Sequence, residues 1–342
     1  MKYKKIFSLL FLVAIFSISL LMIFFKIVSN DTVNSSYFFE KPLLYIKTNI
    51  LDVLGVEEYN DVYRAEDRLI KVVGPTNETV TLENENVIVE VSKKTKTPIY
   101  FSLIPTAEYV QQSKLNRRNL VWNQGNYIDE VYYNVIENVN IIDITDTLLN
   151  CEDNIYFKTE DRISCKGAYY IFQSVMKKLD RQVEDLQEYD IEYYINNYNG
   201  SLSDFFAVKD IYDTISFYRY PLFRRNISMS ITDGNGKTTS YNDVYVKEKK
   251  GLASYMGGEN PITVIKNDET LPNKLLVLSD NTFNVCAGFF VDYFSEITVI
   301  NPTVTLKEQT KIDMDDYDCV LVLFSTNTFN ECSVKNLLNV IE

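Results

Sequence analysis

The sequence predicts an α/β fold: a mainly parallel sheet with helices on both faces, a β-rich insertion, and one N-terminal transmembrane helix. Short apolar runs alternate with helical patterns along most of the chain, as is typical of parallel strands buried on both faces. A stretch rich in Tyr, Asn, Asp and Ser interrupts this alternation at residues 187–265. An uncharged apolar run at residues 6–25 precedes everything else.

The apolar run at residues 6–25 predicts an uncleaved signal anchor. About 20 apolar residues are enough for a helix to cross a bilayer, and Lys2, Lys4 and Lys5 before the run predict a cytoplasmic N-terminus. A cleaved signal peptide is the alternative, but its apolar region is usually about 7–15 residues and ends at a small-residue cleavage site. We therefore expect a single-pass membrane protein with residues 1–29 as cytoplasmic stub and anchor, and with the main domain outside the cytoplasm.

After the anchor, we expect a connector and helix over residues 30–60 and an α/β domain over residues 61–342. Apolar runs in this domain predict buried strands at 98–104, 139–144, 274–278, 296–301 and 319–324. Helical spacing of apolar residues predicts helices at 122–137, 167–186 and 283–294. The inserted region at 187–265 contains alternating stretches and the turn at 233–236, which favour strands.

The composition excludes several kinds of chemistry and partner. The formal net charge is −13, and an acidic surface repels phosphate backbones, so nucleic acid is not an expected partner. Histidine is absent, which removes His general bases, Ser-His-Asp couples and His metal ligands. The cysteines have no CxxC pair or zinc-ligand spacing; we expect no metal or cofactor and interpret them mainly as small buried residues. They are Cys151, Cys165, Cys286, Cys319 and Cys332.

Three separated segments carry a shared pattern: YFKTEDRISCKGAYY at 156–170, KLLVLSDNTFN at 274–284 and DYDCVLVLFSTNTF at 316–329. In this order they resemble the bacterial DHHW protein family, SGNH-hydrolase-like proteins akin to the alginate O-acetyltransferase domains. Weaker agreement occurs at 102–110, 201–206, 232–239 and 256–261. The resemblance implies an SGNH-like fold and a triad with Asp and His from the first segment and a Ser nucleophile from the second.

The family's triad residues are replaced in this sequence. The family's Asp aligns with Glu160, its two His residues with Asp161 and Arg162, and its Ser with Asn281. Arginine stays protonated and cannot act as a base, and an Asn amide is no useful nucleophile for acyl transfer. Because loss of one triad member typically costs several orders of magnitude in rate, the resemblance implies no intact catalytic site.

Several neighbouring residues remain candidates for a role at this site. Thr282 is interpreted either as a displaced nucleophile or as a helix N-cap. Ser279 and Cys286 are also nearby, but the sequence contains no His that could activate them. Glu160, Asp161 and Asp280 are interpreted as part of a solvated charged turn, as the source of an acid that pairs with Arg162, or as an acidic cluster that binds a metal. The candidate cleft residues are Asp161, Asp280, Thr282, Asn284 and Asn260, the last from the Glu259-Asn260 pair that replaces the family's Asn-His.

Together these features predict a membrane-anchored, catalytically inactive SGNH-like protein of the bacterial cell surface. We expect it to bind a surface glycan or an active acyltransferase partner in cell-envelope polysaccharide modification. The alternative within the enzyme class is an O-acyl esterase or O-acetyltransferase with a rearranged active site. A third possibility is a structural envelope protein with no ligand pocket.

Overall fold

The computed structural model describes residues 17, 36–115, 122–208, 210–222, 226–267, 271–307 and 311–342. These residues divide into two units. The first contains helix α2 (Ser36–Val53) and residues 204–208, and the second contains the remaining described residues from Glu58 onward.

The first unit is organised around α2. The Thr48 hydroxyl is buried, donates to the Leu44 carbonyl at 2.9 Å and accepts a hydrogen bond from the Ala207 N–H at 2.8 Å. The predicted anchor at residues 6–25 lies outside the described residues, apart from Ser17. Within the part of the chain that is described, no helix combines the length and apolarity needed to span a bilayer.

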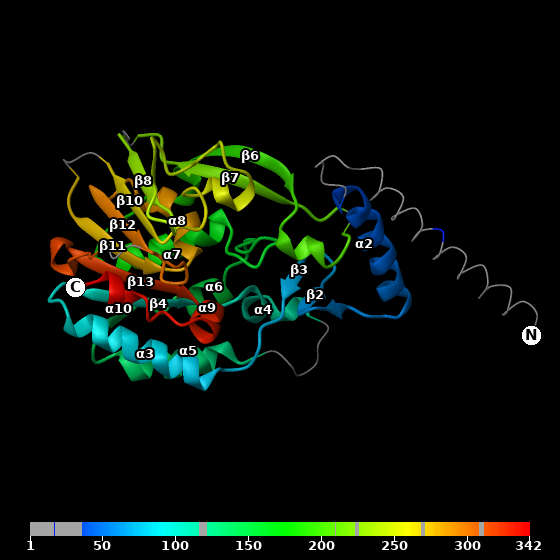
Figure 1. Ribbon diagram of the computed structural model, residues 1–342, viewed down its shortest axis with the longest axis horizontal. Helices are drawn as coiled ribbons and strands as arrows, with labels where there is room; N and C mark the ends of the chain where they lie inside the picture. The colour runs from blue at the N-terminus through cyan, green and yellow to red at the C-terminus, as the bar shows by residue number, and fades with distance from the viewer. Residues whose placement is uncertain are drawn as a thin grey trace, which may run out of the picture. The chain divides into compact units, whose positions relative to one another are not determined.

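The second unit is built on an eight-stranded mixed sheet with strand order β5-β4-β13-β11-β12-β10-β8-β9 (Figure 1). The first five strands in that order pair in parallel, and the last three join by antiparallel pairing. The parallel strands are β4 (Ile99–Ile104), β5 (Asn140–Ile141), β11 (Lys274–Ser279), β12 (Glu296–Ile300) and β13 (Cys319–Ser325). The antiparallel strands are β8 (Ser228–Thr232), β9 (Thr238–Tyr241) and β10 (Ile262–Lys266).

Both faces of β4, β11, β12 and β13 are buried, which explains why their sequences are mostly apolar. Successive side chains point to opposite faces, so in β11 Leu275 and Val277 join one core while Leu276 and Leu278 join the other. The first core lies under α6 (Thr145–Leu149), α7 (Cys165–Lys178) and α8 (Thr282–Phe290). The second lies under α3 (Glu78–Lys93), α5 (Gln124–Val135), α9 (Thr326–Glu331) and α10 (Leu337–Val340), as Figure 1 shows.

The remaining elements are short or lie outside the large sheet. Strands β6 (Asp190–Tyr198) and β7 (Asp213–Arg219) form a separate antiparallel pair within the predicted insertion. Strands β1 (Glu58–Tyr59), β2 (Val62–Arg64) and β3 (Leu69–Lys71) form a third small sheet. Short helical turns are α4 (Ala107–Val110) and the 3₁₀ segments Gln112–Lys114, Leu186–Glu188, Ser201–Asp204, Gly251–Ser254 and Met314–Asp316.

Several of the predicted elements are shorter than their apolar patterns, among them one helix and one strand. The helix predicted over 167–186 ends at Lys178 because Asp180 adopts a left-handed conformation (φ 54°). The Arg181 N–H then donates to the Met176 carbonyl at 2.9 Å, a Schellman-type ending in which Asp takes the place usually held by Gly. The strand predicted over 139–144 pairs only at Asn140 and Ile141. All five cysteines are described, and none forms a disulfide.

Candidate functional site

Polar side chains gather at the carboxyl ends of three neighbouring parallel strands. Asp280 and Asn281 follow β11, Asn301 follows β12, and Ser325 ends β13. Since β11 pairs with both β12 and β13 in parallel, these residues lie along one edge of the sheet. In open α/β sheets this edge is where ligands bind.

Asp280 holds the turn between β11 and α8. Its carboxylate accepts the Thr282 N–H at 2.9 Å, the Ser325 N–H at 3.1 Å and the Ser325 hydroxyl at 2.8 Å. The side chain is buried, with 6% of its surface exposed. Asp280 therefore caps the start of α8 and ties the ends of β11 and β13 together, and it does not present a carboxylate to a ligand as the sequence led us to expect.

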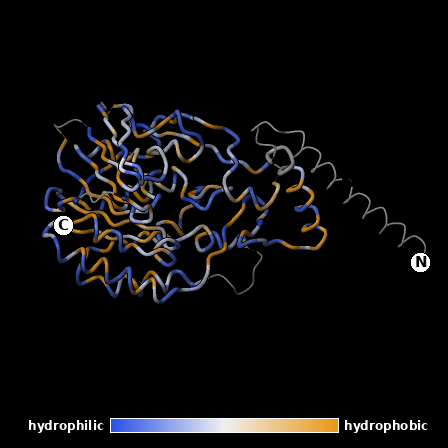
Figure 2. Tube along the Cα trace, in the orientation of Figure 1, coloured by the Kyte–Doolittle hydropathy of each residue, from blue (hydrophilic) through white to orange (hydrophobic). Residues whose placement is uncertain are grey.

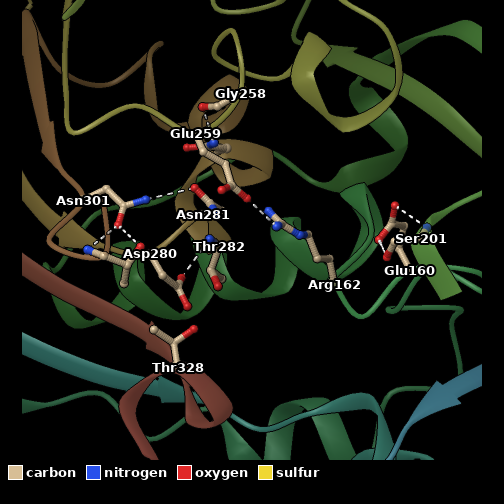
Figure 3. A network of polar contacts seen from close by, with 12 residues as sticks. Glu160, Arg162, Ser201, Gly258, Glu259, Asp280, Asn281, Thr282, Asn301 and Thr328 are labelled. Atoms are coloured by element: carbon tan, nitrogen blue, oxygen red, sulfur yellow. Dashed lines mark hydrogen bonds and ion pairs between the residues drawn. The ribbon is translucent and has the colours of Figure 1, made fainter. Parts of the chain in front are cut away.

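Asn281, at the family's nucleophile position, is the N-cap residue of α8 but makes no side-chain capping bond. Its Oδ1 instead accepts a hydrogen bond from Asn301 Nδ2 at 2.9 Å. Among the described residues its own amide NH₂ has no hydrogen-bond acceptor, and the side chain is partly exposed. The residue thus offers a donor where the family carries a nucleophile (Figure 3).

The hydroxyl and thiol groups near Asn281 are not activated. Ser279 is fully buried in β11, and its hydroxyl has no partner among the described residues. Cys286 lies inside α8 against the Thr282 carbonyl, and burial raises the pKa of its thiol well above the ordinary value. Thr282 is partly exposed, but no described side chain accepts a hydrogen bond from its hydroxyl. No general base is therefore positioned at any of these groups.

Arg162, at the family's base position, points toward the same edge but pairs with Glu259. The Nη2–Oε1 distance is 2.8 Å, and the two side chains are 34% and 55% exposed. A bridge between Tyr156 and Ile163 fixes the loop that carries Arg162, whose carbonyl accepts the Phe157 N–H at 3.0 Å. The ion pair considered from the sequence is present, but its acid is Glu259 and none of Glu160, Asp161 and Asp280.

Glu160 turns away from Arg162 toward the insertion, as Figure 3 shows. Its carboxylate accepts the Tyr198 hydroxyl at 2.7 Å, the Ser201 N–H at 2.9 Å and the Ser201 hydroxyl at 2.7 Å. Gly200 permits this approach, because a Cβ there would lie 2.3 Å from Glu160 Cγ. The carboxylate at the family's Asp position is fully used in fixing the 198–201 turn.

Asp161 lies on the other side of the same loop. Its Oδ2 is 3.9 Å from Lys71 Nζ, and 22% of the side chain is exposed. Burial raises the pKa of Asp161 to about 6, although Lys71 and Arg162 act in the opposite direction. Among the residues that the structure describes, no three acidic or Cys side chains form a group that could hold a metal ion, so the acidic-cluster alternative is not seen.

Two further candidate amides converge on one carbonyl. Asn260 Nδ2 and Asn284 Nδ2 donate to the Gly258 carbonyl at 3.1 and 3.0 Å. This loop is held in an unusual conformation, since Met256, Gly257 and Gly258 all have positive φ angles of 50°, 75° and 97°. The two amides fix the loop that presents Glu259, and their N–H groups are engaged there.

The hydrogen-bond donors at this edge that have no acceptor among the described residues indicate which ligands it could bind. Arg162 keeps guanidinium N–H groups beyond the one bound to Glu259, Asn281 offers its amide NH₂, and Thr282 offers a hydroxyl. Neutral and charged donors of this kind suit oxygen-rich ligands such as glycans. Among the described residues of this edge, no nucleophile is hydrogen-bonded to a base.

Sequence reasoning missed the partners of the candidate residues. The positions of Asn301 and Ser325 could have been inferred, because Asn301 ends one predicted strand, Ser325 directly follows another, and parallel neighbours end at one edge. Tyr198 and Ser201 carried no such signal, since they belong to the inserted region and meet Glu160 only through its fold.

Comparisons with known proteins agree with this architecture. A family model described as DHHW protein matches residues 60–300. A DHHW family protein from Eubacterium siraeum DSM 15702 aligns with a TM-score of 0.64 and 17% identity over 83% of this chain and 97% of that chain. Bacillus cereus PatB1, solved with a sulfonyl adduct, aligns with a TM-score of 0.65 and 17% identity over 80% of this chain and 97% of that chain.

Two further comparisons give a weaker match and no match. The O-acetyltransferase domain of Pseudomonas putida AlgJ aligns with a TM-score of 0.47 and 10% identity over 79% of this chain and 92% of that chain. A search of curated proteins finds no match. The family model nevertheless covers most of the chain, including the loop of Glu160 and Arg162 and the turn at Asn281, and the chain belongs to the DHHW protein family.

Proposed function

We propose that this DHHW protein is catalytically inactive, is anchored at the outer face of a membrane, and works by binding. Its ligand is a surface glycan or an active acyltransferase partner in cell-envelope polysaccharide modification. The anchoring is supported by the apolar run at residues 6–25. The inactivity is supported by one observation above all: Arg162 stands at the base position and is paired with Glu259, while Asn281 stands at the nucleophile position.

The physical argument concerns proton transfer. A hydroxyl attacks an acyl carbon only when a base removes its proton, and the base needs a group that orients it. A guanidinium cannot take a proton near neutral pH, the chain has no histidine, and the Glu160 carboxylate is bound to Tyr198 and Ser201. The three roles of a triad are therefore all unfilled, although the edge still presents donors to a ligand.

The inactivity is tested by two measurements on the purified full chain in detergent. Hydrolysis of an aryl acetate is followed by absorbance, and reaction with a sulfonyl fluoride is followed by intact-protein mass. PatB1 serves as the positive control because its structure carries a sulfonyl adduct. We expect hydrolysis at the rate of the buffer blank and no mass increase.

A relocated nucleophile would give a different pattern. Turnover or a sulfonyl adduct that disappears in Thr282→Ala would make the protein an enzyme with a rearranged site and would overturn the proposal. Asn281→Ala is the matched control, because it alters the neighbouring side chain and leaves the Thr282 hydroxyl in place.

The binding half is tested with defined probes. Neutral chito-oligosaccharides, acidic alginate oligomers and PatB1 are titrated against the full chain by calorimetry. We expect saturable binding to one of them, weakened about tenfold by Arg162→Ala, since a charge-assisted hydrogen bond contributes on the order of 1.4 kcal/mol. If none of the probes binds, the glycan-and-partner part of the proposal fails for these classes, whatever the outcome of the activity assay.

A further inference from the structure

Helix α2 carries an exposed aliphatic stripe that nothing in the described structure covers. The exposed side chains recur at intervals of three and four residues, which places them on one face of the helix. Their exposed fractions range from 42% to 87%. The stripe consists of Leu43, Ile46, Ile50, Val53 and Leu54, and it extends over about 16 Å at 1.5 Å per residue.

The other side of α2 already has its partner. Thr48 is buried and bound to the Ala207 N–H, and Leu44 and Leu51 are half-buried. Asp52 lies about 200° around the helix from Ile50, from a rotation of about 100° per residue, and is exposed. The helix therefore has one side engaged within its own unit, an exposed carboxylate at Asp52, and one apolar face left over. Figure 2, which colours the trace by hydropathy, shows hydrophobic residues recurring along α2.

The position of the stripe in the chain indicates what meets it. Ten residues, 26–35, separate the end of the predicted anchor at Phe25 from the start of α2 at Ser36. Ten residues reach at most about 35 Å even when fully extended. If the anchor spans the bilayer, α2 is confined close to the bilayer surface, and such tethering makes a weak apolar contact effective because the local concentration is high.

Charge identifies the kind of contact. The chain carries a net charge of −13, so an anionic lipid surface attracts it no more than a neutral one does. The stripe itself contains only aliphatic side chains, which favour the boundary between headgroups and acyl chains. The contact expected from these features is hydrophobic and independent of anionic lipid.

We propose that α2 is an interfacial helix that lies on the outer leaflet with the stripe from Leu43 to Leu54 in the lipid. The inference rests on the membrane anchoring proposed above. It assigns α2 a function that the anchor alone does not supply, which is to hold the first unit at the membrane surface. In this proposal lipid covers the stripe, and the alternative is that a second copy of the chain covers it.

The test uses fluorescence of the full chain in phosphatidylcholine vesicles. Trp122 is the single tryptophan, so a Trp122→Phe background allows a reporter to be placed by Ile50→Trp in the stripe or by Asp52→Trp outside the stripe as the matched control. Some of the lipid carries a nitroxide near the headgroup end of its acyl chain, which quenches a nearby indole. We expect blue-shifted emission and severalfold stronger quenching for Ile50→Trp than for Asp52→Trp, unchanged when anionic lipid is added.

The other outcomes are distinguishable. Extraction of the full chain from the vesicles by alkaline carbonate would overturn the anchor and this inference with it. A chain that resists carbonate but shows solvent-exposed emission for Ile50→Trp would overturn the interfacial helix alone and leave the anchor standing. Blue-shifted emission without lipid quenching would assign the stripe to a second copy or another protein and would likewise overturn the proposal.

Discussion

The turn after β11 and the loop at residues 159–162 carry the residues that align with the family's catalytic positions, and their side chains are held in different ways. In the turn, Asp280 binds the first amide of α8 and the end of β13, and Asn281, which aligns with the family's Ser, accepts a hydrogen bond from Asn301. In the loop, Glu160 binds the insertion and Arg162 binds Glu259. In the turn, Asp280 fixes the backbone while position 281 carries no hydroxyl or thiol. In the loop, the side chains of Glu160 and Arg162 are both bound to other parts of the fold.

This difference matters for restoring activity. An Asn281→Ser substitution would place a hydroxyl in a turn whose backbone is already fixed by Asp280. An Arg162→His substitution would return a base with no carboxylate to orient it, because the Glu160 carboxylate already accepts three hydrogen bonds from Tyr198 and Ser201. On the proposed function, restoring acyl-transfer chemistry would therefore require more changes in the loop than in the turn.

The largest effect on stability is expected from removing the Asp280 carboxylate, which fixes the turn after β11. Asp280→Ala deletes a buried carboxylate that accepts three hydrogen bonds and leaves the Ser325 N–H and the Thr282 N–H without their acceptor. We expect a loss of about 3 kcal/mol in the free energy of unfolding, because removing one side of a buried charged network costs its partners as well. Urea denaturation followed by circular dichroism measures this value.

Asp280→Asn is the matched control for that substitution. It keeps one oxygen acceptor and the same volume, so it should lose less than the alanine variant. A loss below about 1 kcal/mol for Asp280→Ala would mean that the turn does not depend on this carboxylate, and the contrast between turn and loop would disappear.

A smaller effect is expected in the loop. Glu160→Gln removes the charge that receives the Ser201 and Tyr198 donors, and its amide NH₂ would face at least one of these donors. We expect a loss of about 2 kcal/mol, in line with hydrogen bonds to a buried charged group, measured in the same denaturation experiment.

A double-mutant cycle sharpens this point. Glu160 and Arg162 should show no coupling energy, since Glu160 binds elsewhere, whereas Glu259 and Arg162 should couple by roughly 0.5 kcal/mol as a half-exposed pair. Strong coupling between Glu160 and Arg162 would contradict the separate roles assigned to them.

The parallel strands were predictable from sequence because both of their faces are buried, which leaves a continuous apolar run such as 274–278. The end of α7 was not predictable from sequence, because Asp180 adopts a left-handed conformation that stops the helix while the apolar spacing continues beyond it. The identities of Asn281 and Arg162 were visible in the sequence. Their partners depended on contacts such as Asn281 with Asn301 and Arg162 with Glu259, which form only when distant segments meet.

The last effect is expected at Asp161, and it depends on pH. Burial raises the folded-state pKa of Asp161 to about 6, above the unfolded value of about 3.9. Between these values the folded chain holds a proton that the unfolded chain has released, so this group destabilises the fold progressively as the pH rises from about 4 to 6, and fully above that. Asp161→Asn should therefore raise the unfolding free energy by about 1 kcal/mol at pH 7.5, less than the full shift implies because the side chain is one-fifth exposed. The gain should vanish near pH 4. A gain that is the same at both pH values would show that the substitution acts through packing and not through the titration of Asp161, and the loop would then carry less electrostatic strain than its burial indicates.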